Sequence, residues 1–210
     1  MNDNIKRFAN YEDANKSHKN VASSILMCVI LISPFVYICS NNAKWLFYSL
    51  IPGILIGVIW GIKAIPHVDY DRRQYYLYSG IMRIFCCFPF CHLAFGILIT
   101  FLNVSISFLI FAYIIIVGLI VVLYLFNKKA IEKGKANKNY SSLSFGACLS
   151  ICIISRILAK NWASVVGENI ILIVASFLFI YAAFAFLNLG VRDFLKYQFI
   201  KQIENKNEVF

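Results

Sequence analysis

Three groups of residues have side chains and spacings that could support chemistry. In the first, Cys87, Cys91 and His92 lie together in an apolar stretch and carry sulfur and imidazole groups that can bind metal ions. Cys91 and His92 are adjacent, so on a helix their side chains diverge by about 100°. Cysteine in such a helix usually serves as a small apolar filler. We therefore favour filler for Cys86, Cys87 and Cys91 over a metal site or lipid-modified thiols.

The second group is a weakly polar stripe that repeats every four residues and ends in a cation. Ser144, Cys148, Cys152 and Arg156 would lie on one face of a helix. A charged side chain at membrane depth costs about 2.5–3.5 kcal/mol on insertion scales. Arg156 therefore either extends to the outer surface, or lines a polar path together with the stripe and His92.

The third group is His67, Asp69 and Asp71, whose alternation would place all three side chains on one side of an extended segment. One interpretation is a cation or phosphate site, and the other is a hydrated loop in which Arg72 and Arg73 balance the aspartates. The sequence contains no nucleotide-binding, metalloprotease or serine-hydrolase motif. We predict no catalytic residue, no cofactor and no metal site.

The elements that must position these residues are membrane-spanning helices. Of 210 residues, 60% are hydrophobic and 14% are charged, and the mean hydropathy is +0.73. A spanning helix needs roughly 20 apolar residues. The sequence predicts an all-α integral membrane protein, a bundle of six transmembrane helices in three hairpins, with spans near residues 21–39, 45–62, 84–102, 106–126, 143–159 and 170–187.

The positive charges predict how the bundle is oriented. Of 20 lysines and arginines, all but Lys44, Arg156 and Lys160 fall in segments that six spans would place on one side. Such segments are normally cytoplasmic, so we expect residues 1–20 and 191–210 to be cytoplasmic. The net charge of +10 then reflects orientation and attraction to an anionic inner leaflet, and nucleic acid is not an expected partner.

The C-terminal tail has an amphipathic pattern. Within residues 191–204, apolar side chains recur at helical spacing. We predict a C-terminal amphipathic helix that either lies on the inner leaflet or continues the sixth span.

Gly53, Gly57 and Gly61 form the most specific local pattern. Glycines four residues apart give a flat ridge on which another helix can pack closely. The ridge could pack inside the bundle, mediate self-association or dock on another membrane protein.

The composition is rich in Ile, Lys, Asn and Phe, and it is similar to that of proteins encoded by AT-rich bacterial DNA. Small membrane proteins of the bacteriocin-immunity, exclusion and phage-defence types are among these. We expect a protein of the bacterial cytoplasmic membrane that acts without catalysis, through helix–helix contacts with another membrane component. The alternative is a small-solute or ion transporter or channel, alone or as a homo-oligomer.

Overall fold

The described part of the chain is helical. The computed structural model describes residues 3–10, 18–40, 43–67, 71–134 and 168–207. Its helices are α1 (Asp3–Asn10), α2 (His18–Cys39), α3 (Trp45–Ala64), α4 (Arg72–Leu102), α5 (Ile106–Glu132) and α7 (Glu168–Asn207). Five of these helices are long and apolar enough to cross a membrane. The all-α prediction is confirmed, and the helices indicate a multi-pass membrane protein.

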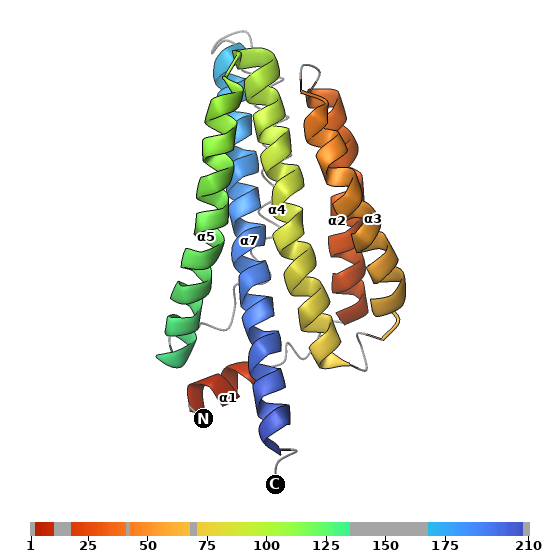
Figure 1. The fold of residues 1–210 in the computed structure, drawn as a ribbon, viewed down its shortest axis with the longest axis vertical. Helices are drawn as coiled ribbons and strands as arrows, with labels where there is room; N and C mark the ends of the chain where they lie inside the picture. The colour runs from red at the N-terminus through yellow and green to blue at the C-terminus, as the bar shows by residue number, and fades with distance from the viewer. Residues whose placement is uncertain (1–2, 11–17, 41–42, 68–70, 135–167, 208–210) are drawn as a thin grey trace.

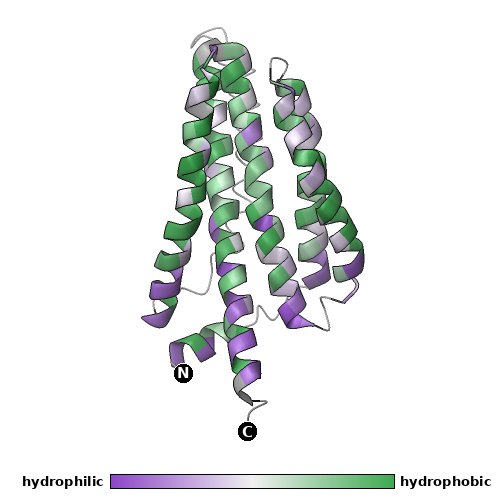
Figure 2. Ribbon diagram, in the orientation of Figure 1, coloured by the Kyte–Doolittle hydropathy of each residue, from purple (hydrophilic) through white to green (hydrophobic). Residues whose placement is uncertain are grey.

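The long helices stand side by side, and successive helices run in opposite directions from α2 to α5 (Figure 1). The α2–α3 pair lies on one side of α4, and α7 and α5 lie on the other. Both termini lie at the same end, where the short α1 contacts α7 and α5. Polar residues gather at this end, whereas the helices are mostly apolar along their length (Figure 2).

The central helix, α4, is longer than the sequence indicated. It begins at Arg72 rather than near Ile84, so most of the expected inner connection is helical. Asp71 caps it, because its side chain accepts a hydrogen bond from the Gln74 backbone N–H at 3.0 Å. Three tyrosines of its first two turns, Tyr75, Tyr76 and Tyr78, are consequently buried.

The last helix resolves the two alternatives for the tail. Glu168–Asn207 is one continuous helix, so the amphipathic segment continues the preceding span. Its apolar side chains Leu195 and Phe199 are buried, and Phe199 meets Phe8 of α1 edge to face at 6.3 Å between ring centroids. This apolar face is therefore covered by protein.

The predicted span 143–159 lies outside the described residues. Ser144, Cys148, Cys152 and Arg156 lie outside them as well.

Candidate functional site

The glycine ridge on α3 faces α4 of the same chain. A Cβ on Gly57 would lie 2.8 Å from the Met82 Cε atom, and one on Gly61 would lie 2.7 Å from the Tyr78 hydroxyl. A Cβ on Gly53 would collide with the Phe85 ring. Side chains of α4 therefore fill the groove over all three glycines, as the internal-packing alternative requires.

A contact between the backbones of two helices involves two glycines that the sequence pattern did not single out. Gly80 of α4 and Gly190 of α7 lie where the two backbones meet. A Cβ on Gly80 would lie 2.8 Å from the Phe194 backbone nitrogen, and one on Gly190 would lie 2.7 Å from that of Ile84. Real Cβ contacts are almost never this short, so only glycine fits both positions at this spacing.

An ion pair lies one turn away from this contact. Arg83 Nη1 of α4 is 2.8 Å from Asp193 Oδ2 of α7, and their side chains are only 12% and 16% exposed. The Ser79 hydroxyl donates a hydrogen bond to the same carboxylate at 2.6 Å. Arg83 lies roughly 16 Å along α4 from Arg72, at 1.5 Å per residue. The pair is therefore enclosed between two apolar helices, where a lone charge would be costly.

Two neutral hydrogen bonds join α5 to α7 in the same half of the bundle. Asn127 Nδ2 donates to Asn188 Oδ1 at 2.9 Å, and the Tyr124 hydroxyl donates to Gln198 Oε1 at 2.8 Å. Together with the Arg83–Asp193 pair, they fix the register of α7 against α4 and α5. Hydrogen bonds between spanning helices contribute about 0.6 kcal/mol each on average.

His92 belongs to a separate buried cluster in the other half of the bundle. Its Nδ1 atom lies 2.8 Å from the Phe88 carbonyl oxygen, and its Nε2 atom lies 3.0 Å from Ser49 Oγ of α3. The Tyr113 hydroxyl of α5 lies 2.8 Å from Nδ1. The Ser49 hydroxyl also donates a hydrogen bond to the Leu46 carbonyl oxygen at 2.8 Å, so these groups form one connected network. The imidazole thus joins three helices and its polar atoms are satisfied by protein groups.

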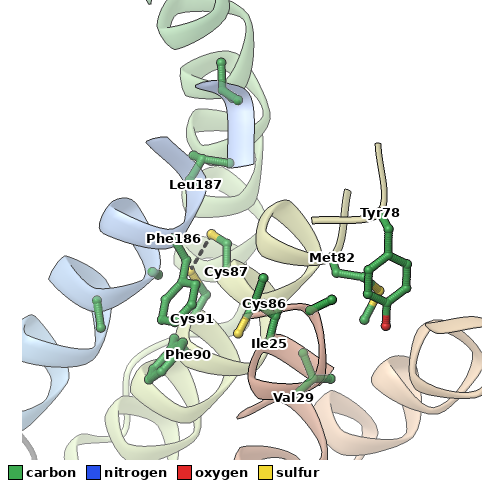
Figure 3. Packing of buried hydrophobic residues seen from close by; sticks show 14 of the residues in the cluster. Ile25, Val29, Tyr78, Met82, Cys86, Cys87, Phe90, Cys91, Phe186 and Leu187 are labelled. Atoms are coloured by element: carbon green, nitrogen blue, oxygen red, sulfur yellow. Dashed lines mark hydrogen bonds between the residues drawn. The ribbon is translucent and has the colours of Figure 1, made fainter. Parts of the chain in front are cut away.

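Cys86, Cys87 and Cys91 of α4 lie among apolar side chains (Figure 3). Cys87 and Cys91 have sulfur atoms 3.8 Å apart on one face of α4, and Cys86 lies 3.8 Å from Cys28 of α2. Within the described ranges, no group of three or more histidine, cysteine or acidic residues is placed to hold a metal ion.

Of the residues assigned to a polar path, His92 alone lies in the described part of the chain. His92 contacts Ser49 and Tyr113, and its relation to the 144–156 stripe falls outside the described residues. The ion pair was missed because Arg83 was assigned to a connection and Asp193 to the cytoplasmic tail. One sequence signal could have found it, since Asn188 and Gly190 shortly before Asp193 interrupt an otherwise apolar helix.

Known proteins give no further guide to this chain. No protein-family model, curated protein or solved structure matches it.

Proposed function

We propose that this protein acts without catalysis in the bacterial cytoplasmic membrane, by contact between α5 and a spanning helix of another membrane protein. Such a contact would block, sense or scaffold its partner. The proposal comprises six membrane crossings with both termini in the cytoplasm. α5 ends at the end of the bundle where the termini lie, and α7 begins at the opposite end (Figure 1). The proposal places a sixth crossing between α5 and α7, because the end of α5 and the start of α7 lie at opposite ends of the bundle.

A seam along α5 carries the proposal. Phe111, Ile115, Gly118, Val122 and Leu125 follow a spacing of four and three residues, the repeat by which one helix packs along another. Apart from Gly118, the side chains of these residues are each at least 48% exposed within the described structure. A Cβ on Gly118 would meet no atom of the described residues within 4 Å, so the centre of the seam is open to close approach there.

This seam replaces the α3 ridge as the proposed contact surface. Gly57 is covered by Met82, so a bulky residue there would first disturb the packing of α3 on α4. An association assay on Gly57 variants would therefore report folding as well as binding. The same assay on Gly118 variants does not have this ambiguity, because no described side chain covers Gly118.

Photo-cross-linking in the native membrane tests the contact. A photoreactive amino acid at Val122 samples the seam, and one at Ile59 of α3 is a matched control, because both side chains are nearly 60% exposed on spanning helices. We expect a protein adduct from position 122 that position 59 does not give. Gly118→Leu, which fills the open centre, should abolish the adduct. Lipid adducts alone at both positions would contradict the proposal.

Transport is the second candidate, and the Arg83–Asp193 pair favours it. An ionisable pair between spanning helices is a common feature of ion and proton pathways. Asp193→Asn preserves the shape and removes the charge. If the protein carries ions, proteoliposomes with Asp193→Asn should lose flux that Asp71→Asn, at the α4 cap, retains. Equal flux in wild type and both variants would exclude a role for this pair in transport.

A further inference from the structure

An apolar groove lies between α4, α5 and α7. It is lined by Ile81 and Ile84 of α4, by Ile120 and Val121 of α5, and by Val191 and Phe194 of α7. Its volume of about 430 Å³ is within the range of about 300–1,000 Å³ of small-molecule sites. Tyr124 also lines it, and its hydroxyl is bonded to Gln198. Among the described residues no charged side chain lines the groove, so a ligand would place any charged part outside it.

Cationic residues continue the lining faces toward the end where the chain termini lie. Lys128 is one turn beyond Tyr124 on α5, and Lys201 is two turns beyond Phe194 on α7, so each shares a face with a lining residue. Both lysines are exposed. Arg73 extends the α4 face in the same way, and Glu204 pairs with it at 3.3 Å. The apolar groove therefore opens toward a basic rim, which lies at the polar end of the bundle (Figure 2).

We propose that this groove binds an anionic phospholipid, with one acyl chain along the groove and the phosphate between Lys128 and Lys201. The apolar walls match the chain, and the two lysines match the negative charge of the phosphate. Basic sites between spanning helices on the cytoplasmic side commonly bind anionic headgroups. Flexible lysine stems can reach the phosphate level while their methylene groups stay against the helices. The site is separate from the α5 seam, because Val121 and Val122 diverge by about 100°.

Native mass spectrometry of the full-length protein tests this site. The protein is reconstituted in vesicles of equal phosphatidylglycerol and phosphatidylcholine, extracted gently, and weighed with its bound lipid. We expect a bound phosphatidylglycerol on the wild type. Val121→Trp fills the groove and should release the lipid, whereas Val122→Trp, on the neighbouring face, should retain it. Ile120→Phe adds less volume and should also release it, and circular dichroism verifies that each variant is helical.

Charge reversal at the rim tests the headgroup assignment. Lys128→Glu and Lys201→Glu should each lower the preference for phosphatidylglycerol over phosphatidylcholine by at least about fivefold, the equivalent of about 1 kcal/mol per lysine. Lys44→Glu, just before α3 at the opposite end, should leave it unchanged. A lipid-free monomer or a lipid-free dimer of the wild type would overturn the proposal, since the chain itself or a second copy would then cover the groove. Equal lipid binding by Val121→Trp and the wild type would overturn it too.

Discussion

Replacing Gly190 with alanine should weaken the packing of α7 against α4. The added methyl group would lie 2.7 Å from the Ile84 nitrogen and 2.8 Å from the Gly80 oxygen. Both are backbone atoms of a regular helix, so neither can rotate away as a side chain would. Ordinary contacts begin near 3.4 Å, and the two helices must separate locally by about 0.7 Å, the difference between 3.4 and 2.7 Å.

The cost follows from this separation. A gap of about 0.5–1 Å forfeits a quarter to a half of the dispersion energy of the atoms beside it. Overpacking by one methyl group typically costs about 1–3 kcal/mol. Alanine recovers up to about 1 kcal/mol through its higher helix propensity. We therefore expect Gly190→Ala to lower the free energy of unfolding by about 1–2 kcal/mol.

Gly118→Ala is the matched control, because it makes the same chemical change in a spanning helix at a position where a Cβ meets no described atom within 4 Å. It should be neutral or slightly stabilising. Both variants can be unfolded in mixed micelles with a rising fraction of sodium dodecyl sulfate, followed by circular dichroism. Equal stability of the two variants would refute the inference that the α4 and α7 backbones meet at Gly190.

Two further predictions concern the packing of α4. Arg83→Leu leaves Asp193 enclosed without its cation and should lower the free energy of unfolding by about 3–5 kcal/mol, whereas replacing both residues by leucine should lower it less. The same unfolding titration measures both effects. A double variant less stable than either single variant would contradict a paired role. The sulfur atoms of Cys28 and Cys86 are 3.8 Å apart, so mild oxidation should form a disulfide that joins α2 to α4. If a protease site is engineered in the chain between α2 and α4, the two fragments should stay linked after cleavage until the disulfide is reduced. Cys28→Ser should abolish the link and Cys39→Ser should not, and fragments that separate without reduction would show that α2 does not pack on α4 as described.

Hydropathy was sufficient to locate the described spanning helices, because each must present enough apolar length to cross the membrane. It did not give their ends. α4 continues to Arg72 because Tyr76 and Tyr78 pack between helices, which their polar hydroxyls did not suggest. The tail after Leu187 continues as helix for a similar reason, since its apolar face contacts α4 and α1.

The helix contacts were harder to predict than the helices. The Gly53, Gly57 and Gly61 pattern indicates a flat packing surface, but a local repeat does not specify which helix will cover it. Gly80 and Gly190 belong to no repeat, and only the crossing of α4 and α7 shows that each faces the other's backbone. The Arg83–Asp193 pair was likewise hidden, because its partners lie more than a hundred residues apart and each resembles an ordinary flanking charge.

The most direct test of the proposed function is the mass of the complex extracted gently from its native membrane, with every component identified. The account predicts a second membrane protein in fixed ratio with this chain, lost when Gly118 is replaced by leucine and retained in the Ile59→Leu control. A complex that contains only this chain, as monomer or homo-oligomer, would contradict it. The transport candidate would then be examined by flux measurements on Asp193→Asn.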